Sequence, residues 1–329
     1  MKYVNYLGTF IILIGVGMLY DRFKEKFDLD DDSKQYELIK KYLLNESSLA
    51  NSKKPLLWIH MNYKKNSRHW QSFYSRSTNC MNQPYQYLSV ASIINHCGNS
   101  FNIVIIDDNT FNKIIPGWTH DMSRIPSPIK MYFRQLALSR ILHHYGGILV
   151  PSSFICCRDL LPMYEYGTRD KGMFIGEFVN NTISNQSGGA NFMPNTRLMG
   201  SVKECSAMLE LVKYIEIMVS QDYTSEALID GNISRKCFEL IHTNKANKID
   251  AGFLGVKSKL GSPIAIDDLM GCTYISFMPN AYGIYIPEYQ ILKRTKFEWF
   301  ARLSEQQVLE SNTIIGKLLL TNAFTPLNV

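Results

Sequence analysis

The residues best placed to do chemistry are Pro151, Ser152 and Ser153, which directly follow the short apolar run ILV at positions 148 to 150. Ligands of α/β proteins bind beyond the carboxyl ends of strands, so the residues after such a run are the first candidates for a site. A neutral serine cannot replace a carboxylate beside a divalent cation without a large loss of affinity. The sequence therefore predicts no metal site at these positions.

The segment from 130 to 160 contains the elements that position these residues. Apolar side chains recur at helical spacing from Tyr132 to Leu142, which predicts a helix. Gly146 and Gly147 follow, where a left-handed C-cap would end that helix. The next apolar run predicts a short buried strand, and Pro151 ends it because proline cannot donate to a sheet ladder.

Within this segment the run from Leu142 to Ser153, LHHYGGILVPSS, resembles the LYKYGGIYLDxD segment of DXD-type glycosyltransferases. The resemblance is to the capsular-polysaccharide-synthesis and sugar-binding DXD families. The resemblance covers about residues 55 to 200. It implies a GT-A fold, which is an α/β architecture with a Rossmann-like mixed sheet flanked by helices.

The same resemblance shows what the chain lacks. In the family, two aspartates hold a divalent metal, Mn or Mg, that bridges the diphosphate of a nucleotide sugar. Pro151 and Ser153 stand at those two positions, and the family's Asp and Arg in the preceding helix correspond to Gln135 and Leu138. The resemblance therefore implies a degenerate DXD site with no confident catalytic residue, no metal and no cofactor.

An active enzyme on this scaffold would need other residues for its donor site. The family places an acidic pair after a similar strand, helix, strand order, which implies that Asp107 and Asp108 contact a nucleoside or a metal. The alternative is that the pair caps a helix around residues 110 to 115. In an active enzyme, a displaced acidic group such as Asp107, Asp108 or Asp159 would hold Mn or Mg, or Arg140 or Arg158 would take the place of the metal. The candidate donor-binding residues are Asp107, Asp108, Arg140, Gly146, Gly147 and Asp159.

Further along the chain, several residues have both a functional and a structural interpretation. A helix is predicted from about Leu198 to Met218, in the region where the family inspects its acceptor. Glu177 is placed to act as a base there, although a lone glutamate is also a common surface residue. The tyrosines near 282 to 289 would stack on a sugar or, alternatively, pack within a sheet.

The sequence divides into three regions. Residues 3 to 20 carry no charge and are long enough to cross a bilayer, so residues 1 to 20 predict a transmembrane anchor. Residues 21 to 54 are polar and predict a stalk, and residues 55 to 329 predict the glycosyltransferase-like domain. A buried N-terminal core helix is the alternative to the anchor.

The charges around this span predict its orientation. Arg22, Lys24 and Lys26 on the far side outnumber Lys2, so the positive-inside rule predicts a single-pass membrane protein with a large cytosolic domain. The seven cysteines show no C-x-x-C spacing, which favours reduced thiols over a zinc site or a disulfide framework. A net charge of +6 is mild for 329 residues, and no nucleic-acid-binding motif occurs, so we expect no nucleic-acid partner.

Three functions fit these observations. The first is a membrane-anchored protein that has lost metal-dependent catalysis and serves as a structural or binding element. Its lysine and asparagine bias and degenerate motif resemble the glycosyltransferase-like proteins of large DNA viruses, which implies a virion protein that links an inner membrane to the capsid. The second is an active glycosyltransferase that works without the DXD metal site. The third is a lectin-like module that keeps a glycan pocket only.

Overall fold

The structure is a computed structural model that describes residues 54–61, 83–179, 192–221 and 226–323. These residues all belong to one compact unit of the chain, Lys53–Val329. The predicted anchor, and the stalk up to residue 53, lie outside the described residues. Among the helices that are described, none has the length and apolar character needed to cross a membrane.

A mixed six-stranded sheet forms the centre of this unit. Its strand order is β2-β1-β3-β6-β5-β7. Strands β1, β2 and β3 run parallel, β5 and β7 run parallel, and β6 is antiparallel to both of its neighbours. The strands are β1 (Leu56–His60), β2 (Asn102–Ile106), β3 (Gly147–Pro151), β5 (Met173–Val179), β6 (Phe192–Ser201) and β7 (Asn247–Ile249). The structure therefore confirms the predicted mixed α/β sheet flanked by helices.

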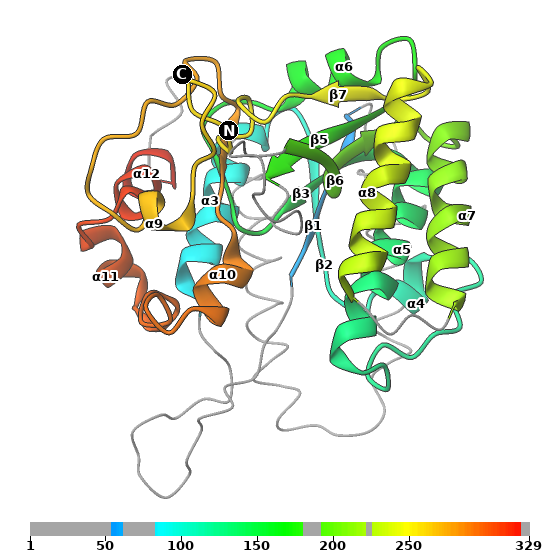
Figure 1. Ribbon diagram of the computed structural model, residues 1–329, viewed down its shortest axis with the longest axis horizontal. Coiled ribbons are helices and arrows are strands. Elements are labelled where there is room, and N and C mark those ends of the chain that lie inside the picture. Colours follow the sequence, from blue (N-terminus) through cyan, green and yellow to red (C-terminus); the bar gives the residue numbers. More distant parts are fainter. Residues whose placement is uncertain (1–53, 62–82, 180–191, 222–225, 324–329) are drawn as a thin grey trace, which may run out of the picture. The chain divides into compact units, whose positions relative to one another are not determined.

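Helices cover both faces of the sheet (Figure 1). On one side lie α4 (Phe111–Ile114), α5 (Ser127–Tyr145), α7 (Ser206–Ser220) and α8 (Glu226–His242). On the other side lies α3 (Pro84–Cys97), while α6 (Leu161–Thr168) packs beside β5 and β7. The sequence pattern of residues 84 to 97 predicts a helix, and the structure confirms it as α3. The helix predicted from Leu198 is wrong at its start, because residues up to Ser201 pair with β3 and β5.

A second layer packs against α3. It contains the small sheet of β4 (Phe154–Cys156) and β8 (Gly283–Tyr285). Its helices are α9 (Ile266–Leu269), α10 (Glu288–Lys293), the 3-10 helix Phe300–Arg302, α11 (Glu305–Glu310) and α12 (Ile314–Ala323). Helix α3 contributes Val90 and Ile93 to the core under the main sheet, and Tyr85 and Leu88 to the core of this second layer. It therefore joins the two cores.

The glycine pair ends α5 and starts β3. Gly146 has a φ of 71° with an extended ψ, and Gly147 has a φ of 100°. Positive φ was predicted, but the chain turns straight into the strand and does not adopt the left-handed helical conformation. A Cβ on Gly147 would lie 2.3 Å from the carbonyl oxygen of Leu56, so only glycine allows β3 to approach β1 this closely.

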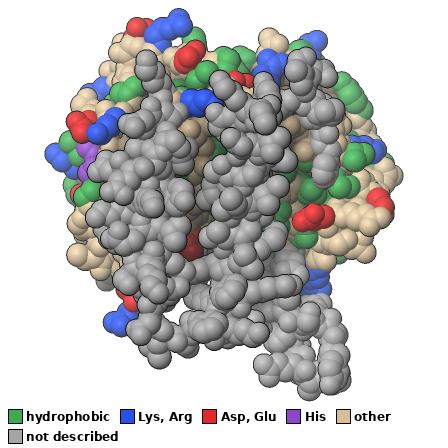
Figure 2. Space-filling view, turned by 180° about the vertical axis from the view of Figure 1, so that it is seen from behind, with side chains coloured by type: hydrophobic (Ala, Val, Ile, Leu, Met, Phe, Trp, Pro, Cys, Tyr) green, Lys and Arg blue, Asp and Glu red, His purple; other side chains and the backbone are tan. Residues whose placement is uncertain are grey.

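The surface shows charges of both signs. Figure 2 shows Lys and Arg side chains next to Asp and Glu side chains around the visible edge of one face, with hydrophobic groups between them. The side chains that can be seen there form no uniformly basic area.

Candidate functional site

The carboxyl ends of the three parallel strands meet at one edge of the sheet. His60 ends β1 and pairs in register with Ile106 on one side and Pro151 on the other. Asp107 and Asp108 directly follow β2, and Ser152 and Ser153 follow β3. The candidate site consists of these strand ends together with the start of α5, as expected for an open α/β sheet.

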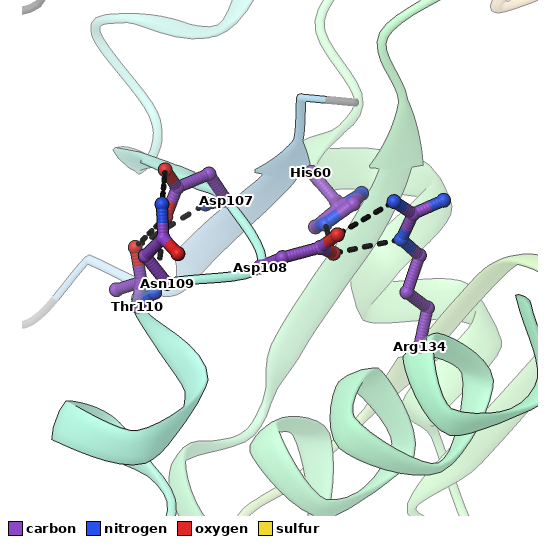
Figure 3. A network of polar contacts seen from close by, with 6 residues as sticks. All are labelled: His60, Asp107, Asp108, Asn109, Thr110 and Arg134. Carbon is purple, nitrogen blue, oxygen red and sulfur yellow. Dashed lines mark hydrogen bonds and ion pairs between the residues drawn. The ribbon is translucent and has the colours of Figure 1, made fainter. Parts of the chain in front are cut away.

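Asp108 is the most strongly held side chain of this edge. Arg134 of α5 donates to its two carboxylate oxygens, from Nε at 2.7 Å and from Nη2 at 2.6 Å. His60 Nε2 lies 3.0 Å from Oδ1, and its ring stacks on Phe111 with centroids 5.4 Å apart (Figure 3). Burial alone would raise the pKa of Asp108, but the hydrogen bonds and charges of His60 and Arg134 outweigh it and hold that pKa well below its usual value.

Asp107 has a local structural role. Its Oδ1 accepts hydrogen bonds from the Thr110 backbone N at 3.0 Å and from the Thr110 hydroxyl at 2.6 Å. Asn109 Nδ2 lies 3.3 Å from its other oxygen (Figure 3). These bonds close the turn before α4, which is the capping alternative considered for the pair.

A polar pocket of about 370 Å³ lies beside Asp108. Its lining residues are Asp108, Asn109, Asn112, Trp118, Thr119, His120, Asp121 and Met122. The indole of Trp118 is buried, and Arg140 lies over its ring at 5.7 Å. Two carboxylates and two amides, with no Lys or Arg in the lining, suit a neutral ligand with several hydroxyl or amide groups better than an anion.

The end of β3 does not fit a divalent metal. Ser152 and Ser153 are both buried, and the Ser153 hydroxyl has no hydrogen-bond partner. Hydroxyl groups are poor replacements for the carboxylate oxygens that Mg²⁺ or Mn²⁺ prefer. Within the described ranges, no three His, Cys, Asp or Glu side chains are grouped so as to hold a metal ion.

The other candidate donor-binding residues lie away from the strand ends. Gly146 precedes β3 and Gly147 is its first residue, so both lie at its amino end, opposite to the strand ends that carry the candidate site. Asp159 accepts a hydrogen bond from Ser100, just before β2, and another from the Leu161 backbone N at 3.0 Å. Asp159 therefore joins the start of α6 to the segment just before β2. Of these candidates, only Asp107 and Asp108 lie at the carboxyl ends of the parallel strands, and β1 separates their strand from β3.

The remaining candidates also have structural partners. Arg140 is ion-paired with Glu216 of α7, with Nη2 and Oε1 2.5 Å apart. Arg158 donates to the Pro279 carbonyl at 3.3 Å. Glu177 accepts from Lys248 at 3.1 Å and from the Ala251 backbone N at 3.3 Å, so it anchors the segment after β7.

Three residues of this region were not recognised as site residues from the sequence: His60, Arg134 and Arg197. His60 ends a predicted strand, so the rule that sites follow strand ends could have found it. Arg134 was out of register with the family's helix arginine. Arg197 gave no signal, since its segment was expected to enter a helix.

Comparisons with known proteins give a limited result. No family model matches the chain, and no curated protein matches it. Among solved structures, one described as "PaToxG Glycosyltransferase" is similar at a TM-score of 0.32 and 12% identity, covering 64% of this chain and 77% of that one. The apo glycosyltransferase GlyE of Streptococcus pneumoniae TIGR4 is similar at a TM-score of 0.31 and 11% identity, covering 61% of this chain and 46% of its own. Both of these solved structures are described as glycosyltransferases.

Proposed function

We propose that this chain is a glycosyltransferase-fold protein that has lost metal-dependent sugar transfer and serves as a binding or structural element. The observation that carries the proposal is the end of β3, where two buried serines stand in place of carboxylates. Without a metal, the diphosphate of a sugar nucleotide would lose much of the charge stabilisation that its departure requires.

Asp108 is not free to supply the missing ligand. Both of its oxygens are engaged by Arg134, and His60 shares one of them. A metal at this carboxylate would have to displace a bidentate guanidinium from a partly buried site. Breaking such a pair leaves an uncompensated charge, which is strongly unfavourable.

The proposal includes a membrane anchor formed by residues 3 to 20, with the α/β domain on the cytosolic side. Its support is the uncharged sequence of that span and the excess of basic residues after it. On this basis the protein links a membrane to other structural proteins, and the viral resemblance makes it a minor capsid protein that connects an inner membrane to the capsid shell. Absence of the protein from both purified particles and membranes would refute this part.

A second candidate function is glycosyl transfer without the usual DXD metal. The pocket beside Asp108 favours it, because its amides and carboxylates suit a nucleoside or a sugar. In this alternative the pocket binds the uncharged part of a donor, and basic side chains bind its phosphates.

Calorimetric titration of the full-length chain with UDP, GDP and their sugars, with and without Mn²⁺, tests these proposals. We expect that Mn²⁺ adds nothing to the affinity for any nucleotide. Binding at micromolar affinity only with Mn²⁺ would contradict the loss of the metal site. Metal-independent binding accompanied by release of free sugar or transfer to an acceptor would establish the second candidate instead of the first.

A further inference from the structure

Arg197 occupies a central position beside the end of β3. The antiparallel register pairs Leu149 of β3 with Met199 of β6. The pairing ends there, because the register of β6 against β5 shifts and residues 196 to 198 bulge out of the ladder. The guanidinium of Arg197 lies over the ring of Tyr285, which pairs with Phe154, the residue after Ser153. In Figure 1, β6 lies next to β3 in the centre of the sheet. The cationic side chain of Arg197 thus lies close to the residues that follow β3.

Aromatic rings surround the Arg197 guanidinium on several sides. Its central carbon lies 5.3 Å from the ring centroid of Tyr289 and 5.9 Å from those of Phe178 and Tyr285. Phe178 and Tyr285 contact each other edge to face, with centroids 5.0 Å apart. The rings belong to β5, β8 and α10, so three separate elements hold the guanidinium in place, and ring faces stabilise its charge.

The rings do not satisfy the hydrogen-bonding groups of this guanidinium. Arginine presents five N–H donors, and no ion pair or side-chain hydrogen bond joins those of Arg197 to the described part of the chain. The side chain is only partly exposed. N–H donors that no protein acceptor engages are open to a ligand that brings acceptor oxygens.

Two carboxylates, of Asp230 and Glu288, also act on Arg197, but they do not contact its guanidinium as the aromatic rings do. Burial would lower the pKa of the guanidinium, yet Tyr285, Tyr289, Asp230 and Glu288 together raise it, so it stays charged. Neither carboxylate lies within ion-pair distance of Arg197, and Glu288 accepts a hydrogen bond from Gln86 Nε2 at 2.6 Å. Asp230 and Glu288 thus stabilise the positive charge of Arg197 at long range, but they do not accept hydrogen bonds from its guanidinium.

We propose that Arg197 is the binding residue for an oxyanion, a phosphate or a carboxylate group of a small ligand, at the carboxyl end of β3. A planar guanidinium matches the paired oxygens of either group, and it needs no divalent cation to do so. The arginines considered from the sequence are engaged elsewhere, Arg140 by Glu216 and Arg158 by the Pro279 carbonyl. This inference extends the proposed function. It rests on that function for one point only, which is that a ligand binds at the carboxyl end of β3.

The test is calorimetric titration of the full-length chain with inorganic pyrophosphate and, separately, with glucuronate, both in the presence of a chelator. We expect at least one of these probes to bind without metal. Arg197→Gln should weaken that binding by about ten-fold or more, because it removes a charge-assisted hydrogen bond. Binding of pyrophosphate alone identifies a phosphate ligand, and binding of glucuronate alone identifies a carboxylate ligand.

Two further variants separate a local effect from a change in folding or net charge. Glu288→Gln keeps the hydrogen bond with Gln86 but removes a negative charge near Arg197, so it should strengthen binding several-fold. Arg235→Gln removes an exposed arginine of α8 and should leave the affinity unchanged.

No binding of either probe to the unaltered protein would overturn the inference, as would an affinity that neither Arg197→Gln nor Glu288→Gln changes. Both results leave the proposed loss of the metal site intact. Binding that appears only when Mn²⁺ replaces the chelator would instead refute the proposed function together with this inference.

Discussion

At the scale of single residues, the deciding feature is how the carboxylate of Asp108 is used. It follows a strand at the edge where α/β proteins bind ligands, but Arg134 and His60 hold it in an internal ion pair. Asp107, its neighbour, closes a turn. Asp107 therefore stabilises the start of α4, and Asp108 stabilises the contact between β2 and α5. Because their carboxylate oxygens are engaged in these contacts, they are poorly available to a metal ion.

Replacing Arg134 tests the strength of this ion pair. We expect Arg134→Met to lower the free energy of unfolding by about 2 kcal/mol, because Asp108 would keep its charge in a partly buried place without its bidentate donor. Urea denaturation at pH 7 measures this. Arg124→Met is the control, since Arg124 pairs with Asp121 at the surface with 87% and 52% of their side chains exposed, and it should change little. Equal effects of the two substitutions would contradict the central role of Arg134.

The same pair predicts a dependence of stability on pH. The pKa of Asp108 is lower in the folded protein than in the unfolded chain, so its contribution is complete above about pH 4 and is lost as the pH falls further. The free energy of unfolding should therefore drop more steeply below about pH 4 in the unaltered protein than in Arg134→Met, whose Asp108 has a less depressed pKa. Parallel pH profiles for the two proteins would refute this assignment.

At the scale of elements, the junction between α5 and β3 sets the position of the whole edge. Gly146 and Gly147 turn the chain within two residues, and the Gly146 carbonyl accepts a hydrogen bond from the Trp58 indole of β1 at 2.9 Å. Strand β3 can then pair with β1 from Ile148 onward. The glycine pair thus acts on the fold, at the end of β3 opposite to the candidate site.

Gly147→Ala should destabilise the protein by about 3 kcal/mol or more, because the new Cβ would meet a backbone oxygen at 2.3 Å and the residue has a φ of 100°. Gly231→Ala in α8 is the matched control. Its Cβ meets nothing within 4 Å, so the higher helix propensity of alanine should raise the stability by about 0.8 kcal/mol. Thermal unfolding of both variants measures the two effects, and a loss at both positions would contradict the steric explanation.

The last helical segment shows how local signals act. The spacing of Ser304 and Gln307 predicts a capping box, which the structure shows at the start of α11. From the sequence we expect one helix from this box to about Leu320, but the chain breaks at residues 311 to 313. There Thr313 Oγ1 accepts a hydrogen bond from the Gly316 backbone N at 3.0 Å. This second cap starts α12, which packs on α3.

At the scale of the whole molecule, the described chain is one α/β unit with two cores joined by α3 (Figure 1). The strand ends with Asp108 belong to the main sheet, whereas Tyr285, Tyr289 and Glu288 come from the second layer. The proposed oxyanion site therefore requires both layers. The pocket beside Asp108 lies between α4 and the loop before α5, within the first layer.

The proposed anchor makes a prediction for the full chain. Deletion of residues 3 to 20 should move the protein from the membrane pellet to the supernatant after carbonate extraction, because an uncharged span of this length supplies the only strong attachment expected from the sequence. Replacing the same segment by an unrelated transmembrane helix should restore the pellet fraction. Retention of the deleted form in the pellet would point to attachment through the α/β domain.

The sequence by itself determined the elements that depend on local patterns. The bounds of α3, the positions of β1 and β2, the glycine stop after α5 and the capping box at Ser304 all follow from residue spacing and backbone preference. The absence of carboxylates after β3 was also readable, since it depends only on the residues at 151 to 153.

Only the tertiary structure decided which charges meet. Asp108 and Arg134 are 26 residues apart, and His60 lies 48 residues from Asp108, so no local spacing predicts their ion pair. Arg197 and the segment after β3 are brought together through Tyr285 of the second layer, and Tyr289 of the same layer lies on the guanidinium. Such pairings depend on how sheets and helices pack over long separations, whereas a short window of sequence contains only the preferences of its own backbone.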